Sequence, residues 1–145
     1  MAKYVVHAGA VLHLASADRA LATGHQLLAP TLMRSQTLSL LHEAVHRGEL
    51  TADAARDQLA RIGRLPIRLL GDAVLRRRAW DLADQLGWPT TYDAEYLALT
   101  QLQADAFVTL DDKLARKVGD VVRVASIDDV VRTARGAKRS PRGRP

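Results

Sequence analysis

Cysteine is absent from this 145-residue chain, and aromatic side chains make up only 4% of it. Without cysteine there is no disulfide framework and no thiolate metal site, which suits a reducing cytoplasm. No apolar run approaches the roughly 18 residues that a membrane helix needs, so we expect no membrane partner. Because aromatics are few, aliphatic side chains must build the core of what the length indicates is one domain.

The net charge of +5 comes from the C-terminus. Residues 135–145 carry five of the 21 basic residues and no acid, so the other 16 basic residues equal the 16 acidic ones. This Gly-, Pro- and Arg-rich segment cannot bury enough surface to order itself. We therefore divide the chain into a domain, 1–134, and a basic tail, 135–145. Arg139, Arg142 and Arg144 in the tail are candidates for RNA contacts, and the alternative is a solubilising terminus.

Strand-like segments alternate with helical patterns along the chain, which is typical of a mostly parallel sheet with helices on both faces. About four to five strands are expected in an α/β fold. The strand-like segments are residues 3–6, 25–30, 65–70, 106–110 and 121–125.

The helical patterns between these segments carry recognisable ends. The first helix is expected to end at Gly24, and the second to run from Pro30 to a left-handed stop at Gly48. Thr51 can cap the third helix. The helix from Asp93 to Ala104 has almost no polar side and should be buried. Further helices are expected to end at Gly87, to follow Asp111, and to begin at Ile127.

Polar residues interrupt the apolar pattern at a few places. Ligands of open parallel sheets bind beyond the carboxyl ends of strands, where strand order reverses, and His7 and Asp111-Asp112 directly follow strand-like segments. Gln36 falls on the apolar stripe of its helix, and Asp93 opens the buried helix. Each has a purely structural alternative: Asp93 and Asp111 as helix caps, His7 and Gln36 as hydrogen-bonded core residues. Together, however, they can converge on one cleft.

The chain resembles the PIN domain, and in particular the VapC-like ribonuclease toxins of bacterial toxin-antitoxin pairs. The resemblance covers residues 3–134 and rests on four segments in order: YVVHAGAVL, APTLMRSQTLSLL, TTYDAEYLAL and FVTLDDKLAR. It implies a PIN-like three-layer fold with a central, mostly parallel sheet. It also implies an antitoxin-like protein and RNA as partners, a homodimer, and a location in the cytoplasm.

The family holds Mg²⁺ with four acids. One follows the first strand, one lies in the helix after the second strand, one is at the start of the buried helix, and one follows the "VT" strand. The matching positions here are His7, Gln36, Asp93 and Asp111, so two of the four acids are replaced. The resemblance implies Asp93 and Asp111 as catalytic residues and metal ligands, with His7 and Asp112 as further candidate ligands. Because His and Gln remove two negative charges, we expect Mg²⁺ or Mn²⁺ to bind weakly, and the histidine nitrogen to favour transition metals.

Two functions from different classes follow from the double replacement. The first is a metal-dependent endoribonuclease that hydrolyses RNA phosphodiesters, weakened or retuned toward Mn²⁺. The second is a catalytically inactive PIN-like module that binds an antitoxin-like partner or RNA. A response-regulator receiver domain is disfavoured, because it needs an acidic pair where this chain has His7-Ala8.

Overall fold

The computed structural model describes residues 1–17 and 20–131. Its centre is a five-stranded sheet in the order β3-β2-β1-β4-β5, and every pair of neighbouring strands is parallel. The strands are β1 (Ala2–Val6), β2 (His25–Pro30), β3 (Ile67–Leu70), β4 (Ala106–Val108) and β5 (Val124–Ala125). The helices are α1 (Ala8–Ala17), α2 (Leu32–His46), α3 (Ala52–Arg64), α4 (Ala73–Leu86), α5 (Tyr92–Gln103) and α6 (Asp112–Val118), followed by the short 3-10 helix η1 (Ile127–Asp129).

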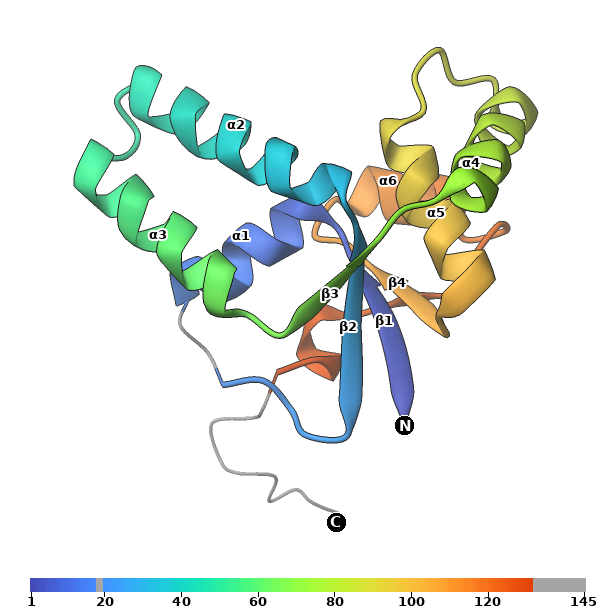
Figure 1. The fold of residues 1–145 in the computed structure, drawn as a ribbon, viewed down its shortest axis with the longest axis horizontal. Helices are drawn as coiled ribbons and strands as arrows, with labels where there is room; N and C mark the ends of the chain where they lie inside the picture. Colours follow the sequence, from blue (N-terminus) through green and yellow to red (C-terminus); the bar gives the residue numbers. More distant parts are fainter. Residues whose placement is uncertain (18–19, 132–145) are drawn as a thin grey trace.

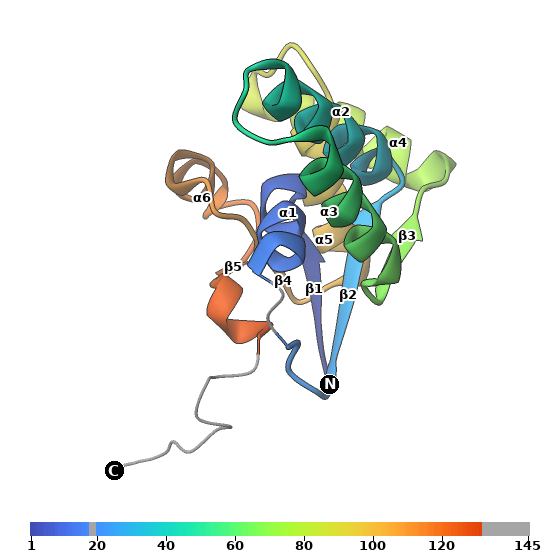
Figure 2. The same ribbon diagram turned by 90° about the vertical axis from the view of Figure 1, so that its left-hand side faces the viewer.

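Helices on both sides of the sheet complete a three-layer α/β fold, as the sequence predicts. Helices α1, α2 and α3 contact one another, whereas α5 packs on β1, β2 and β4 and carries α4 on its outer surface (Figure 1). Helices α2 and α3 form a hairpin that extends away from the strands in Figure 1 and faces the viewer in Figure 2. The fold therefore has a compact layer around α5 and a projecting layer around α2 and α3.

The core is aliphatic, as the scarcity of aromatics predicts. Val5 and Val6 at the end of β1 and all of β4 are buried, and Phe107 is the single Phe of the chain. Helix α5 is buried from Tyr96 to Thr100, which confirms the expectation from its lack of a polar side. Within residues 1–17 and 20–131, no helix is long and apolar enough to cross a membrane.

Most of the predicted turn and cap residues lie at helix ends in the structure. Thr51 caps α3 by accepting a hydrogen bond from the Ala54 N–H at 3.0 Å. Gly48 and Gly87 end α2 and α4 with φ angles of +77° and +72°, the left-handed region in which a side chain is strained.

Two predicted helix boundaries in the first half of the chain are wrong. Helix α1 ends at Ala17, and Gly24 instead lies in a turn with a φ of +83° directly before β2. Pro30 ends β2, where it pairs with Leu70, so α2 begins only after Thr31. Proline is tolerated at a strand end, where its missing N–H interrupts little of the ladder.

The C-terminal helix is also shorter than predicted in the part that the structure describes. The chain forms η1, capped by Ser126, and then an antiparallel bridge between Val131 and Leu21. This bridge holds the segment extended, which is why the helical pattern does not continue there. The rest of the predicted helix and the basic tail lie outside the described residues.

Candidate functional site

Strand order reverses between β1 and β4, which are neighbours in the sheet although far apart in sequence. The register pairs Val6 with Val108, so the residues that follow both strands emerge at the same edge. The His7 N–H continues the ladder by donating to the Val108 carbonyl at 2.9 Å. His7 and the segment from Thr109 to Asp111 thus lie at the position where open parallel sheets bind ligands.

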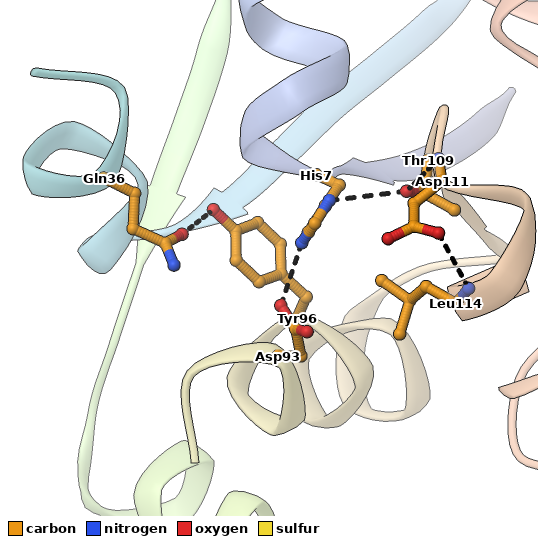
Figure 3. Close-up of polar contacts among 7 residues, drawn as sticks. All are labelled: His7, Gln36, Asp93, Tyr96, Thr109, Asp111 and Leu114. Carbon is orange, nitrogen blue, oxygen red and sulfur yellow. Dashed lines mark hydrogen bonds and ion pairs between the residues drawn. The ribbon is translucent and has the colours of Figure 1, made fainter. Parts of the chain in front are cut away.

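Asp93 lies against His7 at this edge. The first turn of α5 brings Asp93 Oδ1 to 2.9 Å from His7 Nε2 (Figure 3). The His7 side chain is 18% exposed and that of Asp93 is 43% exposed, so the pair lies at the surface and is only partly shielded from solvent. The Asp93 carboxylate therefore bonds the imidazole. The N-cap position of α5, the alternative role considered for Asp93, is occupied by Thr91.

Hydrogen bonds on both sides of the His7 ring determine which nitrogen carries the proton. A carboxylate only accepts, so Nε2 donates to Asp93. In the neutral ring Nδ1 then accepts from the Thr109 hydroxyl, whose oxygen is 3.3 Å away and itself accepts the Asp111 N–H at 3.1 Å. A continuous chain of hydrogen bonds therefore runs from the Asp111 backbone through Thr109 and His7 to Asp93 (Figure 3).

Two aromatic rings hold the imidazole edge-on. The ring centroids of Tyr96 and Phe107 lie 4.9 Å and 5.6 Å from that of His7, both in T-shaped contacts. The Tyr96 hydroxyl donates to Gln36 Oε1 at 2.7 Å and so joins α2 to the site. Burial raises the pKa of Tyr96, and the Asp93 and Glu95 carboxylates raise it further, so the phenol remains a donor at neutral pH.

The two acids after β4 have different surroundings. Asp111 Oδ1 accepts the Leu114 N–H at 3.1 Å, which makes Asp111 the N-cap of α6. Its predicted alternative role as a helix cap is thus confirmed. Asp112 is exposed in the first turn of the same helix. The tail arginines Arg139, Arg142 and Arg144 lie outside the described residues.

The structure brings the four predicted positions to one edge of the sheet, but their donor set does not fit Mg²⁺. Among residues 1–17 and 20–131, no group of three or more His, Asp or Glu side chains is placed so that it could hold a metal ion. Mg²⁺ requires near-octahedral oxygen ligands. Here one Asp93 oxygen accepts the imidazole N–H and one Asp111 oxygen accepts a helix N–H.

Sequence reasoning missed Tyr96 and Thr109, which complete the network. Tyr96 lies three residues after Asp93 and therefore on the same face of α5, and a fully buried tyrosine needs a partner for its hydroxyl. Those two signals were available in the sequence. Nothing in the sequence indicates that Thr109 bonds a ring, because that contact depends on the pairing of β1 with β4.

Comparison with known proteins supports the fold. No protein-family model matches the chain, and no curated protein matches it. A solved structure, described as the crystal structure of PAE2754 from Pyrobaculum aerophilum, superposes with a TM-score of 0.65. The two chains share 22% sequence identity, and the similarity covers 88% of this chain and 92% of the other. At this identity the likeness shows a shared fold alone.

Proposed function

We propose that this chain is a VapC-like PIN-domain protein of a toxin-antitoxin pair whose cleft has lost Mg²⁺-dependent RNA cleavage and which acts by binding an antitoxin-like protein. The observation that carries this proposal is the hydrogen bond between His7 Nε2 and Asp93 Oδ1. Metal-assisted phosphodiester hydrolysis needs dense oxygen ligands around one or two cations. In this cleft an imidazole N–H already engages one of the two surviving acids.

The α2–α3 hairpin supplies a surface for the protein partner. Helix α3 buries only Ala55, and between the two helices lies an open groove of about 320 Å³. Leu38 and Leu59 in this groove are 54% and 38% exposed. The groove is lined by Leu38, Leu41, His42, Val45, Ala52, Ala55, Arg56 and Leu59. An amphipathic helix that buries apolar side chains in the groove and sets acids against His42 and Arg56 would fit it.

A Mn²⁺-dependent ribonuclease is the second candidate. It is favoured by the contact between His7 and Asp93 beside the strand-order reversal, because a nitrogen and a carboxylate suit a transition metal better than Mg²⁺; side chains would have to rearrange to add Asp111 as a third ligand. In this candidate Asp93 and Asp111 remain the main ligands.

RNA cleavage separates the two candidates. Structured RNA is incubated with Mg²⁺ or Mn²⁺ and with the wild type, Asp93→Ala, or the double variant His7→Asp/Gln36→Glu. We expect no cleavage by the wild type in either metal and cleavage by the double variant. Cleavage by the wild type that Asp93→Ala abolishes would overturn the proposal in favour of the ribonuclease. Equal cleavage by the wild type and Asp93→Ala would identify a contaminating nuclease, which a repreparation must remove.

Other expectations complete the proposal. The balanced charge of residues outside 135–145 provides no net attraction for RNA, so RNA contacts would depend on the basic tail. A homodimer and a cytoplasmic location stay predictions. A short antitoxin-like reading frame next to this gene would support assignment to a toxin-antitoxin pair.

A further inference from the structure

The two replaced acid positions differ in what they present to the cleft. Gln36 Oε1 accepts the Tyr96 O–H at 2.7 Å, a bond that a carboxylate oxygen at the same place would accept equally. His7 instead presents an N–H to Asp93 Oδ1 at 2.9 Å. Position 36 thus keeps an oxygen, whereas position 7 has changed from an acceptor to a donor.

We infer that His7 alone determines the metal specificity of the cleft: its N–H takes the place of a cation on Asp93 and excludes Mg²⁺, while Gln36 has no part in the exclusion. This inference deepens the proposed function and rests on the family assignment made there. It concerns binding of the ion and is independent of whether RNA is cut.

The exclusion is built into the fold because His7 is held on all sides. Its ring nitrogens contact Asp93 and Thr109, and its faces and edges meet Tyr96 and Phe107. Its backbone N–H and C=O are bonded to Val108 and Val11. An ion that took the place of the ring N–H on Asp93 Oδ1 would have to displace the ring from its contacts with Thr109, Tyr96 and Phe107 together.

Mg²⁺ is poorly suited to compete for that position. It dehydrates reluctantly and needs oxygen ligands in near-octahedral geometry. With His7 in place, Asp93 and Asp111 each retain a single carboxylate oxygen outside the hydrogen bonds described, which is too few for a dedicated site. Replacing the ring by a carboxylate would both free Asp93 and add a third acid at the same edge.

Calorimetric titration with MgCl₂ tests the inference on four proteins: wild type, His7→Asp, His7→Asn and Gln36→Glu. His7→Asn is the matched control, since it has the size of the aspartate without its charge. We expect His7→Asp to raise Mg²⁺ affinity by at least about tenfold over the wild type, and His7→Asn, which frees Asp93 without adding an acid, to raise it less. A wild type that binds Mg²⁺ as tightly as His7→Asp, or an equal gain from Gln36→Glu, would overturn the inference.

A second measurement decides the matter if His7→Asp does not fold. Nitrogen-15 NMR of the wild-type His7 ring should report the proton on Nε2, unchanged by MgCl₂. A change of tautomer or a shift of these resonances on adding MgCl₂ would contradict the inference. Failure of this inference can be distinguished from failure of the proposed function. A wild type that binds Mg²⁺ without cutting RNA contradicts only the inference. A wild type that cuts RNA with Mn²⁺ but does not bind Mg²⁺ contradicts only the proposed function.

Discussion

Tyr96 connects His7 and Gln36. Its ring packs edge-on against His7 and its hydroxyl donates to Gln36, so one buried side chain supports both. Breaking the hydrogen bond of a buried hydroxyl lowers the free energy of unfolding, because both the donor and the acceptor lose their partner. Tyr96 therefore supports the positions of both side chains.

Tyr96→Phe should lower the free energy of unfolding by about 1 kcal/mol, because the bond to Gln36 disappears while the ring remains. Urea unfolding followed by circular dichroism measures this change. Tyr92→Phe is the matched control, since Tyr92 is 56% exposed on the same helix and should change little. Equal midpoints for Tyr96→Phe and the wild type would show that the hydroxyl contributes nothing to the fold.

Glu95 should make stability depend on pH. Burial raises its pKa and Arg76 offsets part of that rise. Because the folded-state pKa lies above the unfolded one, the stabilising contribution is present below the unfolded pKa and is lost as pH rises through the folded pKa. At neutral pH the charged, partly buried carboxylate is therefore a cost to the fold.

Glu95→Gln should raise stability at pH 7 by a few tenths of a kcal/mol, a small effect because the side chain is partly solvated. The gain should vanish below about pH 4, where glutamate is protonated. Thermal unfolding across this pH range is the measurement. Glu49→Gln is the opposite control, because Arg47 lowers the pKa of Glu49 and its removal should reduce stability at neutral pH. A loss of stability for Glu95→Gln at pH 7 would contradict this account.

At the scale of elements, α6 depends on its N-cap residue. Asp111 caps it through the Leu114 N–H, and the helix is only seven residues long. A cap is worth about 1 kcal/mol, and asparagine caps as well as aspartate does. Asp111→Ala should thus cost about 1 kcal/mol of folding stability in chemical denaturation, while Asp111→Asn should cost little. If both variants lose the same amount, the charge and not the cap matters at this position.

The α2–α3 hairpin is the element we assign to partner binding. Leu38→Glu should weaken binding to a co-expressed antitoxin-like protein by about tenfold or more, since it places a charge in the apolar groove. Pull-down or calorimetry with the co-purified partner checks this. Val74→Glu on α4 is the matched control, because Val74 is similarly exposed at 49% but lies outside the groove. Equal binding by Leu38→Glu and Val74→Glu would place the partner elsewhere.

Local patterns predict the elements well where the signal is a cap or a period. The predicted range of β2, residues 25–30, is the range in the structure, and Thr51, Gly48 and Gly87 mark helix ends as predicted. The errors occur where tertiary pairing decides. The pairing of Pro30 with Leu70 delays the start of α2, and the bridge to Val131 holds Leu21 extended where a helix is predicted; neither partner is visible in a local window.

The same division applies to the candidate site. The rule that ligand-binding residues follow strands predicts His7 and Asp111 at one edge, and the sheet order brings the ends of β1 and β4 together there. Asp93 is predicted from its place at the start of the buried helix, and its contact with His7 brings it to the same edge. The hydrogen bonds among them were not predictable. They depend on ring orientation and on the β1–β4 register, which bring Thr109 and Asp93 to opposite nitrogens of one imidazole.

At the scale of the whole molecule, the strand order places the cleft. β1 lies between β2 and β4 in the sheet. The chain passes from β1 to β2 on one side and later adds β4 on the other side, so the strand order reverses at the end of β1, beside His7. The solved structure from Pyrobaculum aerophilum shares this overall fold across most of both chains. At this identity the likeness extends to the fold alone, and the residues at the edge beside His7 are known only for this chain.

The most direct test of the central claim is a crystal structure of the wild type grown with MnCl₂, with anomalous scattering used to locate the metal. The account predicts His7 Nε2 within hydrogen-bond distance of Asp93 and no manganese between Asp93 and Asp111. A manganese ion bound by both aspartates, with His7 turned aside or ligating it, would contradict the account and favour a metal-dependent nuclease.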